Sequence, residues 1–281
     1  MTSRERVLAA LRRQDVDHVP CCCFFSPSLA GPRYTWEGRA DSLERIVREL
    51  GLDGLVAVGL EASVHPSVTW RTWTESVPGE PWPVLRKEIA TPAGPLTAAV
   101  RRTDDWPHGD DIPLNSDWNV SRFVKPWIET MADVERYRYV QLPPSAADIG
   151  AARERFAASQ RLADQYQAIT YASCGMGLTA GIQLFGAEPG VALSMDRPDI
   201  VERFLAVEHE ATMGRAAALA HMGVDVICRN GFYETMDFWS PRQVRAFLDP
   251  LIRAEIEVMK SGGAVVTYTV CTGIMPMLDL L

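Results

Sequence analysis

The chain has 281 residues, of which 47% are hydrophobic, enough for one large domain or two small ones. Its formal net charge of −8 excludes a nucleic-acid partner held mainly through phosphate contacts. No apolar run reaches membrane-spanning length and the first residues contain no apolar signal core, so we expect no membrane association. Six cysteines, three of them consecutive, lie in strand-like runs, which predicts reduced thiols in the cytoplasm rather than a secreted disulfide framework.

Five short apolar or β-branched runs are predicted to be buried strands of a parallel sheet. These strands are expected at residues 19–25, 55–60, 168–174, 224–228 and 264–270. Helical patterns lie before and between them, at 3–11, 42–50, 131–139, 148–165, 179–185, 188–194, 199–222 and 241–260, and a further helix begins at 275. This alternation predicts βαβ units. No GxGxxG follows the first strand, so a dinucleotide-binding fold has no support.

A second pattern interrupts this alternation after the second strand. Residues 69–73, 84–89 and 96–102 alternate apolar and polar side chains, with a turn at Ala93, Gly94 and Pro95 between the last two. This pattern predicts an antiparallel hairpin excursion near residues 69–104, set outside the main sheet. We expect it to belong to a single barrel domain that spans residues 1–281.

The expected fold class is α/β, of the (β/α)8 TIM-barrel type. Five buried strands do not close an eight-stranded barrel, and the usual barrel length would need ~80 more residues. An open barrel would expose apolar strand edges, which is an aggregation hazard. We therefore expect either that the last βα units are missing from the chain or that its open edge is covered by another subunit, as in a homodimer.

The stretch 224–241 has the most informative pattern, because polar and aromatic residues directly follow a buried strand. Ser240, Pro241 and Gln243 then form a helix start with a capping box. In α/β proteins ligands bind at the carboxyl ends of strands, where such loops gather. We assign catalytic roles to Tyr233 and Glu234, and substrate contacts to Arg229, Asn230, Phe238 and Trp239. The alternative is an ordinary connection with an Arg–Glu ion pair.

Two further candidates follow the second strand. Glu61 lies directly after it, and His65 is near enough to act as a general base. Cys21 and Cys23 share one strand face and are more often small buried residues than pocket thiols. Cys174, Cys228 and Cys271 lie near the ends of three strands, but metal sites usually also include His or a carboxylate.

Several segments resemble the uroporphyrinogen decarboxylase superfamily, which includes corrinoid-dependent methyltransferases. The resemblance is carried by TSRERVLAALRRQDVDHVP, TPAGPLTAAVRRTDDWP, FVKPWIETMADVERYRYV, MGVDVICRNGFYETMDFWSP and GGAVVTYTVCTG, in this order along the chain. It implies a (β/α)8 barrel whose strand ends form one deep pocket. By the same comparison, the family's last strands and helices are absent here.

The decarboxylase branch of this family implies an Arg-x-x-x-Arg pair after the first strand, which binds substrate carboxylates. No arginine stands there, and Arg33 is the nearest substitute. Glu61 would replace the family's aspartate after the second strand. Decarboxylation of a polyanion needs fixed positive charge, and a single arginine supplies little of it. This branch implies no cofactor.

The methyltransferase branch implies zinc bound by His-x-Cys and a later Cys. The motif reads Thr269, Val270 and Cys271, so Cys271 matches and Thr269 departs, and a Thr hydroxyl is a poor zinc ligand. A related route passes a methyl group from a small donor to a corrinoid (cobalamin) on a partner protein.

Our leading interpretation is methyl transfer between a small substrate and a corrinoid protein or thiol. The first alternative is uroporphyrinogen decarboxylase-type decarboxylation in porphyrin biosynthesis. The second is a catalytically inactive remnant or a binding subunit.

Overall fold

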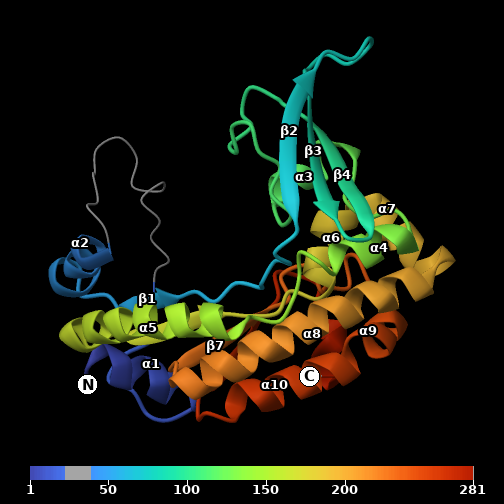
Figure 1. The fold of residues 1–281 in the computed structure, drawn as a ribbon. Coiled ribbons are helices and arrows are strands. Elements are labelled where there is room, and N and C mark those ends of the chain that lie inside the picture. The colour runs from blue at the N-terminus through green and yellow to red at the C-terminus, as the bar shows by residue number, and fades with distance from the viewer. Residues whose placement is uncertain (23–38, 281) are drawn as a thin grey trace.

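A four-stranded parallel sheet forms the base of the structure (Figure 1). The computed structural model describes residues 1–22 and 39–280. The strands are β1 (Leu55–Val58), β6 (Ile169–Ser173), β7 (Val226–Asn230) and β8 (Val265–Thr269), in the order β1-β6-β7-β8. Strand order thus follows chain order without reversal, as in a barrel and unlike a doubly wound sheet. The fold is therefore α/β with a parallel sheet, and closure into a barrel stays a prediction.

Three long helices cover one face of this sheet. They are α5 (Ala146–Tyr166), α8 (Pro198–Met222) and α10 (Asp249–Lys260). Apolar side chains of alternate strand positions, such as Val58, Ala172 and Ile227, share one buried cluster with Leu219 of α8 and Met259 of α10. Burial of this apolar face stabilises the layer of helices on the sheet.

Helix α1 (Ser3–Leu11) closes the amino-terminal edge of the sheet. Thr2 and Glu5 form the expected capping box, and Val7 packs against Ile169 and Val226. Towards the carboxyl-terminal edge the same face of the sheet is open, because Ala57, Ser173 and Thr269 are exposed. The carboxyl ends of the strands are therefore accessible to a ligand.

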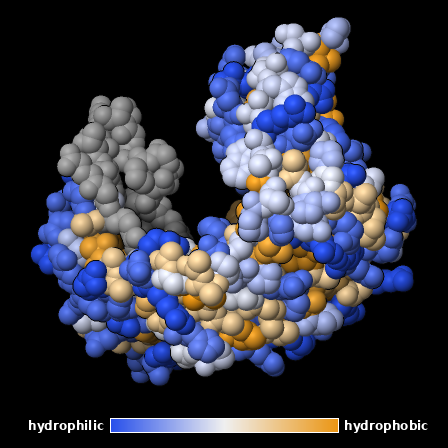
Figure 2. Space-filling model, viewed as in Figure 1, coloured by the Kyte–Doolittle hydropathy of each residue, from blue (hydrophilic) through white to orange (hydrophobic). Residues whose placement is uncertain are grey.

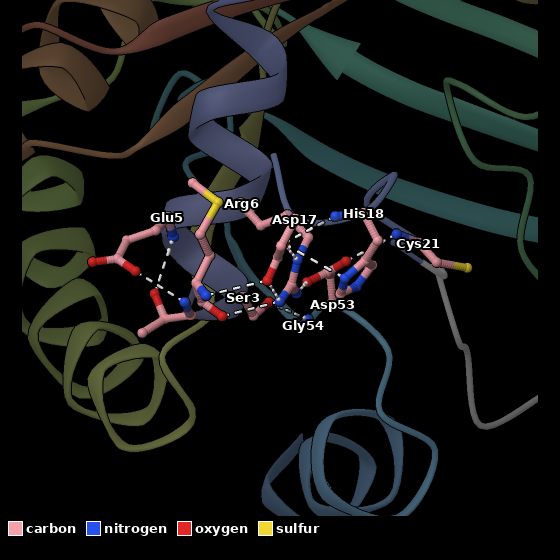
Figure 3. A network of polar contacts seen from close by, with 10 residues as sticks. Ser3, Glu5, Arg6, Asp17, His18, Cys21, Asp53 and Gly54 are labelled. Atoms are coloured by element: carbon pink, nitrogen blue, oxygen red, sulfur yellow. Dashed lines mark hydrogen bonds and ion pairs between the residues drawn. The ribbon is translucent and has the colours of Figure 1, made fainter. Parts of the chain in front are cut away.

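Polar contacts fix α1 to the start of β1 (Figure 3). Arg6 donates hydrogen bonds to Asp53 (Nη1 to Oδ1, 2.6 Å) and to Asp17 (Nε to Oδ1, 2.6 Å). The backbone N–H of Gly54 donates to Ser3 Oγ at 3.0 Å. Because these groups lie at the opposite edge from the open strand ends, they have a structural role.

The second sheet is an antiparallel meander that projects from the helical body (Figure 1). Its strands are β2 (Thr69–Glu75), β3 (Val84–Thr91), β4 (Gly94–Arg101) and β5 (Phe123–Lys125). Leu85 pairs with Val100 in register, and both belong to a buried cluster that also contains Phe185 and Phe204. Figure 2 shows hydrophobic residues at the base of the projecting sheet, where it meets the body. Antiparallel pairing of β2, β3 and β4 therefore spans residues 69–101, outside the parallel sheet.

The other elements connect these layers. They are α2 (Arg39–Leu43), a π-helix (Glu44–Glu49), α3 (Asp117–Val120), α4 (Met131–Tyr137), α6 (Leu178–Phe185), α7 (Ala187–Asp196), α9 (Pro241–Phe247) and a 3₁₀ helix (Met275–Leu280). No helix among the described residues is long and apolar enough to span a bilayer. The five described cysteines form no disulfide.

Two of the expected elements differ from the structure. The strand expected at 19–25 forms only a single bridge between Cys22 and Asp53 in its described part, and Val19 is 82% exposed, so a buried strand there is wrong as far as residue 22. The helix expected at 241–260 is split into α9 and α10. Pro250 lies in the first turn of α10, where its missing N–H is tolerated but a continuous helix is not.

Candidate active site

A cavity of about 320 Å³ lies at the carboxyl-terminal edge of the parallel sheet. Its walls come from the residues that end β1, β6 and β7 and from one side chain of α8. The lining residues that carry polar groups are Glu61, Tyr171, Ser173, Cys174, Arg215 and Asn230. This size suits a small molecule and falls at the lower end of typical ligand pockets.

Two of the predicted site residues meet in this cavity. Glu61 follows β1 and is exposed, and Asn230 is the last residue of β7. The backbone N–H of Asn230 donates to the Gly175 carbonyl at 2.9 Å, which fixes the end of β7 beside the end of β6. The parallel register of the strands thus places a carboxylate and an amide in the same cavity.

Arg215 of α8 also lines the cavity, and sequence analysis missed it. Its Nε is buried and has no hydrogen-bond partner, and among the described residues its guanidinium forms no ion pair with a carboxylate. A usable signal was present, because this arginine interrupts a run of small and apolar residues, Met213 to Leu219, on a helix that packs against the sheet. Charged groups that are partly removed from water usually have a partner, so a half-buried guanidinium that lines a cavity without a carboxylate indicates a binding role.

Cys174 lies deeper in the same wall. It is 2% exposed, and its thiol donates to the Thr212 carbonyl at 3.7 Å. Burial raises the pKa of the Cys174 thiol to about 11. The thiol is therefore protonated at neutral pH and is a poor nucleophile.

Arg229 and Glu234 form a buried network beside the cavity rather than lining it. The two Nη groups of Arg229 donate to the Glu234 carboxylate, and its Nε donates to Glu255 of α10 at 2.8 Å. Glu234 also accepts the Leu178 N–H at 2.9 Å and the Tyr268 hydroxyl at 2.5 Å. Arg229 and Glu234 are 1% and 0% exposed, so they hold β7, its following loop and α6 together. The predicted Arg–Glu ion pair is present.

The aromatic residues of the 231–239 loop form a separate group. Tyr233 is half-buried, and burial together with the Asp117 carboxylate raises its pKa to about 12. Phe238 packs edge-on against the Tyr233 ring, with centroids 5.7 Å apart. Trp239 is fully buried, and its Nε1 donates to the Tyr233 carbonyl at 2.9 Å. Trp239 therefore fixes the loop, and Tyr233 and Phe238 are its partly accessible side chains.

The remaining predicted residues lie elsewhere. His65 packs edge-on against Tyr139, and its Nδ1 is 2.8 Å from Ser67 Oγ, so it does not line the cavity. Cys271 is exposed after β8. Arg33 lies outside the described residues. In the part of the chain that the structure describes, no three His, Cys, Asp or Glu side chains gather as a metal site.

Comparison with solved structures gives a likeness at the level of the fold. The structure resembles that of a methyltransferase from Methanosarcina mazei, with a TM-score of 0.51 and 16% sequence identity, over 100% of this chain and 73% of that protein. No protein-family model and no curated protein sequence matches the chain. At this identity the likeness establishes a shared α/β fold and nothing about the substrate.

Proposed function

We propose that this chain is a methyl-transferring enzyme whose small methyl donor binds in the cavity at the carboxyl ends of β1, β6 and β7. The observation that carries the proposal is the position of this cavity, because barrel enzymes bind substrates at this edge of the sheet. The fold shared with a methyltransferase supports it. The resemblance to the uroporphyrinogen decarboxylase superfamily agrees with both observations.

The methyl acceptor in this proposal is a corrinoid carried by a partner protein. A cavity of about 320 Å³ is too small for a corrin macrocycle, so the partner would present the corrinoid at the cavity mouth. When bound there, the corrinoid would supply a cobalt centre that accepts a methyl group. The chain itself would bind the donor, orient its methyl group towards the mouth and exclude water.

Glu61 is the proposed acid–base residue of the cavity. Transfer of a methyl group from an amine or ether leaves a basic nitrogen or oxygen, which needs a positioned proton donor or a counter-charge. Asn230 would orient the donor through its amide. Tyr233 and Phe238 would contact the partner or the donor from the loop after β7. Arg229, Glu234 and Trp239 would act as positioning residues, because they are buried.

A zinc-activated thiol acceptor fits the structure less well. Cys271 is exposed, and Thr269 stands where the family motif places a histidine. Because no three metal-binding side chains gather among the described residues, one thiolate is the whole ligand set found there. These residues therefore do not fit a zinc site.

The test is methyl transfer to free cobalamin in its Co(I) state, kept reduced by titanium(III) citrate, by the 281-residue chain. The absorbance change on methylation follows the reaction, with methylamines and aryl methyl ethers as donors. We expect Glu61→Gln to lower turnover by about 10²–10⁴-fold, the usual contribution of a general acid or base. The matched control is Glu202→Gln, an exposed carboxylate on α8 that lies away from the cavity. Full turnover by Glu61→Gln would overturn the role of Glu61.

Decarboxylation is the second candidate, favoured by the positive charge of Arg215 in the cavity. A polycarboxylate would need more fixed positive charge than one guanidinium provides. Release of CO₂ from uroporphyrinogen without methyl transfer would establish this alternative. Absence of both reactions, with binding of a partner protein, would support a binding subunit.

A further inference from the structure

Two opposite charges line the same small cavity without being paired. Glu61 enters from the end of β1 and Arg215 from α8. Among the described residues, neither side chain forms an ion pair or a hydrogen bond with an oppositely charged group. The two arginines that are buried among the described residues behave differently from the half-buried Arg215, because Arg6 bonds to two carboxylates and Arg229 to two others.

The surroundings of Arg215 do not supply its counter-charge. Its guanidinium lies against the Cys174 thiol, which is protonated at neutral pH. The buried Glu208 carboxyl is within electrostatic range of Arg215, but it accepts the Tyr137 hydroxyl at 2.5 Å and forms no ion pair with Arg215. The Arg215 side chain lines the cavity, and among the described residues none of its guanidinium nitrogens bonds to a carboxylate, so the part of the guanidinium that faces the cavity can bind a ligand carboxylate.

Glu61 supplies the complementary charge. It is exposed at the cavity wall, and the half-buried Tyr171 lines the same cavity. A carboxylate next to an aromatic residue favours a cationic ligand group, including an alkylated ammonium. Because both charged side chains line one cavity of about 320 Å³, a small ligand in it has an anion-binding group and a cation-binding group in the same wall.

We infer that the cavity binds a small zwitterion, with its carboxylate on Arg215 and its ammonium group on Glu61. If the cavity also binds the methyl donor, as in the proposed function on which this step rests, that donor is an N-methylated amino acid. Recognition of both charges would hold the ammonium nitrogen, and therefore its methyl groups, at a fixed place relative to the cavity mouth. A donor with only one charge would lose this orientation.

Binding of three matched probes tests the inference without any corrinoid. The probes are trimethylglycine, which is a zwitterion, choline, which keeps only the cation, and 3,3-dimethylbutyrate, which keeps only the carboxylate. We expect the wild-type chain to bind trimethylglycine at least about tenfold more tightly than either single-charge probe, as each lost charge-assisted contact predicts. Equal affinity for all three, measured by calorimetry or ligand-observed NMR, would overturn the inference.

Variants separate the two ends of the ligand. Arg215→Gln should weaken trimethylglycine and 3,3-dimethylbutyrate by about tenfold and leave choline unchanged, and Glu61→Gln should weaken trimethylglycine and choline instead. Arg161→Gln, on the exposed part of α5, is the control for loss of a positive charge. Arg215→Lys keeps the charge if the glutamine variant does not fold, and it should retain part of the carboxylate binding. Unchanged carboxylate binding in folded Arg215→Gln would refute the assignment.

The outcome is distinguishable from failure of the proposed function. If the chain binds the zwitterion but transfers no methyl group to cobalamin from any donor, the inference is supported and the proposed function is contradicted. Methyl transfer from an uncharged donor, with no measurable trimethylglycine binding, would keep the function and remove the inference.

Discussion

Arg229 and Glu234 form a fully buried ion pair between the carboxyl-terminal end of β7 and the loop that follows it. Glu255 accepts a third hydrogen bond from the same guanidinium and is itself 2.9 Å from His209 Nδ1. The network therefore joins β7, its loop, α8 and α10 directly beside Asn230, which lines the cavity. Its polar groups fix the wall of the site without contacting a ligand.

Replacing Glu234 by Ala should strongly destabilise the protein. The substitution leaves Arg229 buried with a single carboxylate partner and leaves the Tyr268 hydroxyl and the Leu178 N–H without an acceptor. Breaking a buried pair in this way typically costs about 3–5 kcal/mol of unfolding free energy. Urea denaturation measures this loss, and Asp199→Ala, which breaks an exposed pair with Arg197, should show none that is measurable. A loss no larger than that of the control would contradict a structural role for Glu234.

Gly231→Ala should destabilise the protein through the same network. A Cβ at Gly231 would overlap the Tyr268 ring and the Glu234 carboxylate, both of which are held by hydrogen bonds. Overpacking of this kind typically costs about 1–3 kcal/mol. The control is Gly150→Ala on α5, where a Cβ meets nothing within 4 Å, and we expect a gain of about 0.5–1 kcal/mol there. Equal behaviour of the two variants in thermal unfolding would show that the loop yields to the extra methyl group.

The sequence predicted the strands and helices wherever hydrophobic periodicity was strong. The capping boxes at Thr2 and Ser240 were visible because the capping residue and its partner lie three positions apart. The expected buried strand at 19–25 shows the limit of this reasoning. An apolar run indicates burial only if another layer covers it, and at Cys21 and Cys22 none of the described residues does.

The site was harder to predict because it depends on contacts between distant segments. Glu61 and Asn230 could be predicted, since the carboxyl ends of parallel strands share one edge. Arg229 and Glu234 stand in the expected loop, but no local pattern shows that Glu255 and Tyr268, far along the chain, complete a buried network with them. Arg215 belongs to a helix, and only the packing angle of α8 brings it to the cavity.

Stability should decrease as pH rises above the ordinary pKa of a glutamate, because of Glu208. This carboxyl is 3% exposed, and burial raises its pKa above the ordinary 4.5. Between these two pKa values the folded state keeps a proton on Glu208 that the unfolded state has lost. The contribution of protonated Glu208 to the free energy of unfolding is therefore complete below pH 4.5 and is lost as pH rises through the raised pKa. Glu208→Gln keeps an acceptor for the Tyr137 hydroxyl and should remove this decrease. Denaturation midpoints of both proteins from pH 5 upward measure it, and parallel curves would contradict the assignment.

The cysteines should differ widely in reactivity in the folded protein. Cys271 is exposed, whereas Cys174 is buried and has its pKa raised to about 11, so about a thousandth of it is thiolate at pH 8. Brief treatment with iodoacetamide, followed by peptide mass mapping, should label Cys271 and leave Cys174 and Cys228 unmodified. Labelling in denaturant is the control and should reach all three. Equal labelling of Cys174 in the folded chain would show that the cavity wall opens.

Arg6→Ala should weaken the amino-terminal edge of the sheet and make the stability of the protein less dependent on acidification. The substitution leaves the Asp53 carboxylate, which is 1% exposed, without its cation, and such a loss typically costs about 3–5 kcal/mol. For a domain of this size we therefore expect the midpoint of thermal unfolding to fall by roughly 6–20 °C. Arg6 also holds the pKa of Asp17 well below its ordinary 3.8. An acid whose pKa is lowered in the folded state stabilises the protein above pH 3.8, and this stability is lost as pH falls through the pKa of the folded state. Arg6→Ala lacks this contribution, so it should lose less stability than the wild type on acidification between pH 5 and pH 2.

The measurement is thermal unfolding at pH 7 and at a series of acidic values, followed by circular dichroism. Arg12→Ala removes an exposed arginine just after α1 and serves as the control for charge. Arg6→Lys keeps the charge but cannot reach Asp53 and Asp17 with the same fork of donors, so it should recover only part of the loss. Because this network lies at the edge opposite the cavity, trimethylglycine binding by folded Arg6→Ala at low temperature should equal that of the wild type. Loss of that binding in a folded variant would show that the two edges of the sheet are coupled.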